Sequence, residues 1–106
     1  MHAQPFTVTI CDQTIHVHGD VDMAATQQLL EAITHVAGNQ EHRSVVVDMA
    51  SLTFLDSAGI AALIDAHKAI EAMGKEMTID NVPERTHRTL TLAGVVGYLN
   101  VQVVSR

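Results

Sequence analysis

Short apolar runs open the chain, and a helical pattern follows them. The runs over residues 6–10 and 14–18 predict two strands, and Cys11-Asp12-Gln13 between them predicts a hairpin turn. From Met23 onward, apolar residues recur every three or four positions, which predicts an amphipathic helix that ends at Gly38-Asn39. Asp22 is expected to cap this helix, because its carboxylate can accept hydrogen bonds from the free amides of the first turn. The helix is expected to bury one face, made of Ala25, Leu29, Ile33 and Val36.

The rest of the chain alternates between strands and helices. Residues 44–48 read SVVVD, a continuous apolar run typical of a strand covered on both faces, and residues 49–55 are expected to form a loop. A second helix is predicted over 56–73 with Gly74 as its stop. A strand over 77–80, a third helix from Pro83 to about residue 93 and a last strand over 101–104 complete the pattern.

The predicted order of elements is therefore β-β-α-β-α-β-α-β. Strands separated by single helices imply right-handed crossovers, so we expect an α/β fold with a mostly parallel sheet. No linker, repeat or low-complexity segment interrupts the pattern, and residues 1–106 are expected to form a single domain.

Composition and charge narrow the classes of protein that fit. Hydrophobic residues make up 47% of the 106 residues, which excludes wholesale disorder. The formal net charge of -6 argues against binding to nucleic acid and against attraction to an anionic membrane. One cysteine cannot form an internal disulfide, and the N-terminus shows no signal peptide. No apolar run is long enough for membrane insertion, so a cytoplasmic protein is expected.

Motifs of catalysis are not found in the sequence. Neither GxxxxGK[ST] nor GxSxG occurs. His16 and His18 would share one side of a strand, but no third metal ligand can be identified, and Cys11 has no Cys or His beside it in sequence. Asp20 and Asp22 fit a loop carboxylate and a helix cap better than a paired-carboxylate site. We therefore expect a protein that is not an enzyme and needs no cofactor or metal.

The informative segment is Asp56-Ser57-Ala58-Gly59-Ile60. It is predicted to begin a helix at the carboxyl end of a central strand, the edge where ligands and partners usually bind in open α/β sheets. Local chemistry alone favours simple capping by Asp56 or Ser57, with Gly59 allowing close packing.

Nearly the whole chain, from about residue 7 to residue 101, resembles the bacterial anti-sigma-factor antagonists of the STAS (sulphate transporter and anti-sigma antagonist) family. The resemblance lies in the VVVD strand, the LTFLDSAGI turn and helix, the AMGKEMTI junction and the helix ending in LAG. GDVD before the first helix also matches the family pattern. The resemblance implies the STAS fold.

The resemblance also implies a switch. In such proteins the serine after the Asp is phosphorylated by an anti-sigma factor that is itself an ATP-dependent serine kinase, and a serine/threonine phosphatase reverses the reaction. The unmodified antagonist captures the anti-sigma factor and so frees the sigma factor. Carried over to this sequence, the phosphoacceptor is Ser57 and the carboxylate before it is Asp56. Asp22 matches an acidic residue that often lies at the partner interface.

Ala58 departs from the pattern of many relatives, which have Ser or Thr after the acceptor. An Asp-hydroxyl-Ala-Gly turn also resembles the STAS subunits of phospholipid-transport ATPases, where the domain braces an ATPase subunit. That role, and a scaffold component of a stress-signalling assembly, are the alternatives to the antagonist.

Helical periodicity suggests where a partner would bind. The buried stripe of the second helix is predicted to comprise Gly59, Leu63, Ala66, Ile70 and Met73. Ile60 and Ile64 fall at its edge, where they are either a margin of the core or, with Met23, an apolar patch beside Ser57. The predicted partner-binding residues are Asp22, Met23, Asp56, Ser57, Gly59, Ile60 and Ile64.

Overall fold

Strands and helices follow one another in the predicted order in a computed structural model, which describes residues 4–103. The elements are β1 (Thr7–Cys11), β2 (Thr14–Val21), α1 (Thr26–Ala37), β3 (Ser44–Leu55), α2 (Ser57–Ala72), β4 (Glu76–Val82), α3 (Glu84–Leu92) and β5 (Val101–Val103). The prediction of an α/β fold is confirmed.

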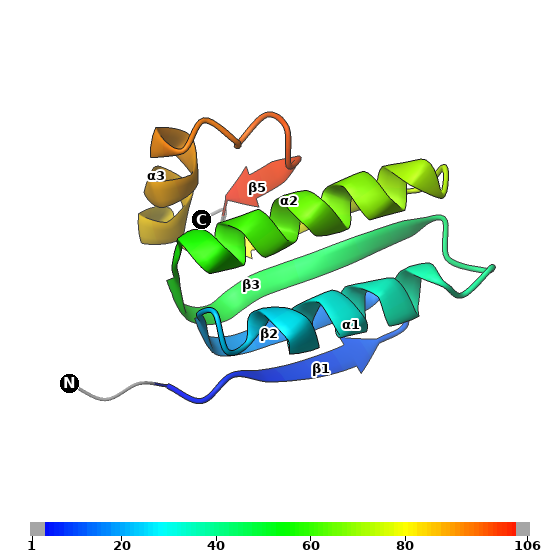
Figure 1. The fold of residues 1–106 in the computed structure, drawn as a ribbon, viewed down its shortest axis with the longest axis horizontal. Helices are drawn as coiled ribbons and strands as arrows, with labels where there is room; N and C mark the ends of the chain where they lie inside the picture. The colour runs from blue at the N-terminus through cyan, green and yellow to red at the C-terminus, as the bar shows by residue number, and fades with distance from the viewer. Residues whose placement is uncertain (1–3, 104–106) are drawn as a thin grey trace.

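The strands form one sheet in the order β1-β2-β3-β4-β5 (Figure 1). β1 pairs antiparallel with β2 through a tight turn that Cys11 and Thr14 close, and the other neighbours are parallel. Asp12 in the turn has a φ of 53°, a left-handed conformation that Asp tolerates better than most residues. The hairpin and the mostly parallel sheet agree with the sequence prediction, except that Cys11 belongs to β1 and not to the turn.

Only one face of the sheet is packed against α1 and α2, which lie side by side across it (Figure 1). In β3 the side chains of Val45, Val47 and Met49 are buried, whereas Val46 and Asp48 between them are half-buried. The prediction that this strand is covered on both faces was therefore wrong. The opposite side, which we call the open face, carries mostly polar side chains on β1 to β4.

β3 is longer than predicted, because residues 49–55 continue the strand and do not form a loop. β2 pairs with this extension up to its last residue, Leu55, which lies opposite Val21. β2 likewise continues through Gly19-Asp20-Val21, beyond the predicted end of the strand at residue 18. Gly19 has a φ of 86°, and a Cβ there would overlap the carbonyl oxygen of Pro5, so this irregular point of the strand requires glycine.

α1 begins at Thr26, three residues later than predicted, because residues 23–25 form a turn before it. The prediction that Asp22 caps the helix was wrong, because the N-cap of α1 is Ala25 and no side chain caps it. Asp22 caps the preceding turn, where its Oδ1 accepts from the Ala25 amide at 3.2 Å. The buried face is as predicted, since Ala25, Leu29, Ile33 and Val36 are all at most 4% exposed.

α2 buries four of the five predicted stripe residues, which are Gly59, Leu63, Ala66 and Ile70. Met73 is 47% exposed, and its assignment to the core was wrong, because the helix ends at Ala72 and the chain turns away at Gly74, whose φ is 75°. His67 is buried instead, and its ring packs against that of Tyr98 with centroids 4.5 Å apart.

The C-terminal part agrees with the prediction, although β4 extends at both ends. Pro83 directly precedes α3, and Leu90 and Leu99 are fully buried. The last residue of the predicted final strand, residue 104, lies outside the described residues. Of the helices within residues 4–103, none combines the length and the apolar character needed to span a bilayer.

Candidate functional site

The candidate site is the junction between β3 and α2. Asp56 caps the helix, because its Oδ1 accepts from the Gly59 amide at 3.0 Å and its carbonyl accepts from the Ile60 amide at 3.0 Å. Ser57 is the first helical residue and is exposed. Its hydroxyl makes no hydrogen bond to any described residue. Of the two capping candidates in the sequence, Asp56 is therefore the cap, and the Ser57 hydroxyl is accessible.

Gly59 allows α2 to approach the ends of two strands. A Cβ on Gly59 would lie 2.5 Å from Leu55 Cδ1 and 2.9 Å from both Val21 Cγ1 and the Val21 oxygen. Such distances are far below van der Waals contact, so a larger residue would push the helix outward. Gly59 is buried, and its contribution to the site is to position the residues on either side of it.

Two acidic residues meet at this edge of the sheet because their strands are parallel neighbours. Asp22 follows β2 and Asp56 follows β3, the last paired residues are Val21 and Leu55, and the Asp56 amide donates to the Val21 oxygen at 3.2 Å. Each carboxylate is half-buried and accepts from a backbone amide. The same edge therefore carries two hydrogen-bonded carboxylates, of which Asp56 directly precedes the exposed Ser57.

The apolar candidates differ in exposure. Met23 is 77% exposed, whereas Ile60 and Ile64 are half-buried and pack against the core. Phe54, which is not among the predicted site residues, is 53% exposed two residues before Asp56. Residues 49–55 were predicted to form a loop, so no side could be assigned to Phe54. In a strand, the alternation of side chains places Phe54 on the open face, opposite to the buried Leu55.

Asp20 and Asp22 do not form a paired-carboxylate site. Asp20 accepts hydrogen bonds from the Thr53 hydroxyl and, at 3.1 Å, from the Gln4 amide, and so ties β2 to β3 and to the N-terminal segment. Asp22 caps the turn before α1. Each carboxylate has its own local partners, although Asp20 lies in β2 and not in the predicted loop, and Asp22 does not cap α1 itself.

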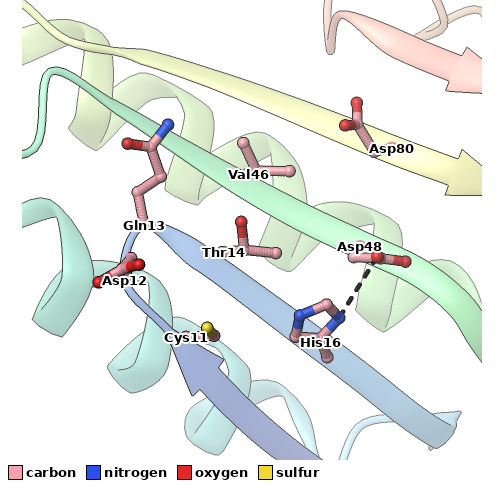
Figure 2. Close-up of a pocket in the computed structure, with 8 residues that line it drawn as sticks. All are labelled: Cys11, Asp12, Gln13, Thr14, His16, Val46, Asp48 and Asp80. Atoms are coloured by element: carbon pink, nitrogen blue, oxygen red, sulfur yellow. Dashed lines mark ion pairs between the residues drawn. The ribbon is translucent and has the colours of Figure 1, made fainter.

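A polar hollow of about 450 Å³ lies on the open face near the hairpin (Figure 2). His16 Nδ1 lies 3.3 Å from Asp48 Oδ2, and the side-chain Nδ2 of Asn81 donates to the same oxygen at 3.2 Å. Cys11 lines this hollow and is exposed. Among residues 4–103, no group of three or more His, Cys, Asp or Glu side chains is arranged to hold a metal ion. His16 is thus engaged with a carboxylate of the neighbouring strand.

Comparison with known proteins agrees with this architecture. Residues 7–104 match the model of the STAS domain, and the chain therefore belongs to the STAS domain family. Among curated relatives, an anti-sigma F factor antagonist from Paenibacillus polymyxa is 22% identical over 81 residues, which are 76% of this chain and 69% of that protein. An anti-sigma-B factor antagonist from Staphylococcus aureus is 24% identical over 87 residues, which are 82% of this chain and 80% of that protein.

A solved structure with the same fold is an anti-sigma factor antagonist from Mycobacterium paratuberculosis. It superposes with a TM-score of 0.76 at 21% identity, over 92% of this chain and 84% of that one. The antagonist SpoIIAA in its unphosphorylated form superposes with a TM-score of 0.70 at 16% identity, over 96% of this chain and 90% of that one. The STAS fold inferred from the sequence is confirmed.

Proposed function

We propose that this protein is an anti-sigma-factor antagonist, a regulator and not an enzyme, that binds a kinase-type anti-sigma factor when Ser57 is unmodified. Phosphorylation of Ser57 ends this binding, and a serine/threonine phosphatase restores it. The names of the curated relatives support the class of function.

The observation that carries the proposal is the state of Ser57. Its hydroxyl is exposed and takes no part in capping, because Asp56 already accepts from the Gly59 amide. A kinase can therefore modify the hydroxyl without first breaking a hydrogen bond of the fold. Ala58 carries no hydroxyl, so Ser57 is the only acceptor at this helix start.

The chemistry of a phosphate at this position fits a switch. A phosphoserine carries about -1.5 to -2 charges at pH 7. The positive end of the α2 dipole and its first-turn amides tolerate this charge, so the domain stays folded. A partner packed on the same turn would have to desolvate the phosphate next to Asp56, which costs several kcal/mol without a cation opposite it. Phosphorylation is therefore expected to end binding without unfolding the protein.

The proposed contact surface surrounds Ser57. Met23 contributes an exposed apolar side chain, and Ile60 and Ile64 contribute the outer parts of half-buried ones. Asp22 and Asp56 supply carboxylates at fixed positions, which suit a cationic group on the partner. Gly59 allows α2 to pack closely against Val21 and Leu55, and so fixes the position of this surface relative to the sheet. A mixed surface of this kind is typical of reversible protein complexes.

The proposal is tested by incubating the protein with candidate anti-sigma factors and Mg-ATP, followed by intact-mass measurement and peptide mapping. We expect one added phosphate on Ser57 and none on Ser57→Ala. Calorimetric titration of purified phosphoprotein should then show lost binding. Stoichiometric labelling of Ser57→Ala at Thr53 or elsewhere, or undiminished binding by the phosphoprotein, would contradict the proposal.

The second candidate is a STAS subunit of a phospholipid-transport ATPase, favoured by the Asp-Ser-Ala-Gly turn. It predicts stable co-purification with an ATPase subunit and no dependence of that complex on Ser57 phosphorylation. Co-expression with each class of partner separates the two functions.

A further inference from the structure

β1 is the outer strand of the sheet, and no other strand among residues 4–103 pairs with its second edge. Cys11 and Thr14 close the tight hairpin, so the backbone groups of Thr7, Thr9 and Cys11 point to β2. Backbone groups of successive residues alternate between the two sides of a strand. In agreement, the backbone oxygen of Gln13, next to Thr14, points the other way and accepts from the Val46 amide of β3. The N–H and C=O groups of Val8 and Ile10 therefore point outward. Figure 1 shows no other described element beyond this edge.

The edge lacks the features that usually protect outer strands. Residues of β1 read TVTIC, with neither a charge nor a proline, although natural edge strands commonly carry one of these. Ile10 is 43% exposed and lines a hollow of about 290 Å³ together with His35 and Val36 of α1. An uncharged strand edge with an exposed aliphatic side chain suits pairing with another strand.

We infer that two copies of this chain pair through their β1 strands, antiparallel and with Thr9 opposite Thr9 on a two-fold axis. This register places Val8 opposite Ile10 of the second copy, and these residues exchange the N–H···O bonds that one copy leaves open. It covers the exposed Ile10 with an aliphatic side chain on the helix-covered face. On the open face it brings the two Thr9 side chains together, a favourable cross-strand pair.

Charge favours a second copy in this orientation. The strand itself is uncharged, and Asp12 is the first charged residue after it. An antiparallel pair places the two Asp12 carboxylates at opposite ends, whereas a parallel pair would bring them together. The same surface patch is used by both copies, as a two-fold interface requires.

The size of the contact sets its strength. One five-residue edge on each side is smaller than the roughly 800 Å² per partner of standard stable interfaces. We therefore expect a reversible dimer, with a dissociation constant between about 10 μM and 1 mM. β1 lies two strands away from β3, after which Ser57 follows, so the inference does not rest on the proposed function.

Sedimentation velocity over a range of protein concentrations tests the pairing. We expect the wild type to shift from monomer to dimer, and Thr9→Lys and Thr9→Glu each to raise the dissociation constant at least about tenfold, because like charges then face each other across the axis. An equimolar mixture of the two variants should recover the dimer, since opposite charges are paired. Thr9 is exposed, so circular dichroism melts should show both variants folded.

Gln28→Lys, an exposed change on α1, is the matched control and should dimerise as the wild type does. A wild type that stays monomeric at millimolar concentration would overturn the inference. That result would hold against self-pairing even if the β1 edge bound a strand of an unrelated protein. Unchanged dimerisation of Thr9→Lys, or failure of the mixture to recover the dimer, would overturn the register.

Discussion

Gly59 and Val21 lie so close together that any side chain at position 59 would clash: an added Cβ would lie 2.9 Å from the Val21 carbonyl oxygen. The same oxygen accepts from the Asp56 amide at 3.2 Å. The end of β2 is thus joined to the start of α2 by a hydrogen bond and by direct packing. Asp22, which follows Val21, and Ser57, which follows Asp56, are held at one edge by this joint.

Gly59→Ala is predicted to destabilise the protein by about 1–3 kcal/mol, because the methyl group overlaps Leu55 and Val21. Denaturant unfolding measures the loss. Gly97→Ala is the matched control, since a Cβ there meets no atom within 4 Å, and its unfolding midpoint should not fall. Equal stability of the two variants would contradict the close packing.

Asp56→Ala should cost about 1 kcal/mol of unfolding free energy through loss of the cap on α2. Asp56→Asn keeps an oxygen that accepts from the Gly59 amide, so it should retain most of the stability. Thermal melts of the two variants give the comparison, and a neutral Asp56→Ala would show that the cap is dispensable.

Ser57→Ala should change the stability by less than about 0.5 kcal/mol, because Asp56 and not Ser57 is the cap. Under the proposed switch, this variant keeps its affinity for the anti-sigma factor and becomes insensitive to ATP. Ser57→Asp should melt no lower than the wild type, since a carboxylate suits a helix N-terminus, but should bind more weakly. Thermal melts and calorimetric titrations on the same samples measure the stability and the affinity. Wild-type affinity in both Ser57→Asp and the phosphoprotein would contradict the proposed switch.

Met23→Asp should weaken binding to the anti-sigma factor at least about fivefold, which corresponds to a loss of about 1 kcal/mol of binding free energy. Its melting temperature should stay unchanged, because Met23 is 77% exposed. Leu92→Asp is the control, since Leu92 is an equally exposed apolar residue at the end of α3, with 84% exposure. Equal binding by both variants would remove Met23 from the proposed surface.

Ile64→Asp tests whether Ile64 belongs to the margin of the core or to the proposed contact surface. Because this side chain is half-buried against the core, the variant should lower both the melting temperature and the affinity. An affinity loss much larger than that of Met23→Asp, at unchanged melting temperature, would assign Ile64 to the contact surface alone. Unfolding of the variant would assign it to the core alone.

Local patterns in the sequence determined much of the fold. The hairpin, the buried face of α1, the start of α2 at Asp56-Ser57 and its stop at Gly74 depend on residues close together in the chain. Periodicity, caps and turn residues report such features directly. The family resemblance likewise depends on contiguous motifs, and it selected the junction between β3 and α2 as the site.

Tertiary structure alone decided the features that depend on distant residues. Residues 49–55 become strand because β2 pairs with them through Val21, and SVVVD alternates in burial because α1 and α2 cover only one side of it. Met73 leaves the core because α2 ends at Ala72 and the chain turns away at Gly74. Asp56 and not Ser57 is the cap, because pairing between β2 and β3 continues to Leu55 and leaves Asp56 extended, with Ser57 as the first helical residue. Burial and strand pairing depend on which residues are neighbours in space. A single sequence indicates such neighbours only where they are also close together along the chain.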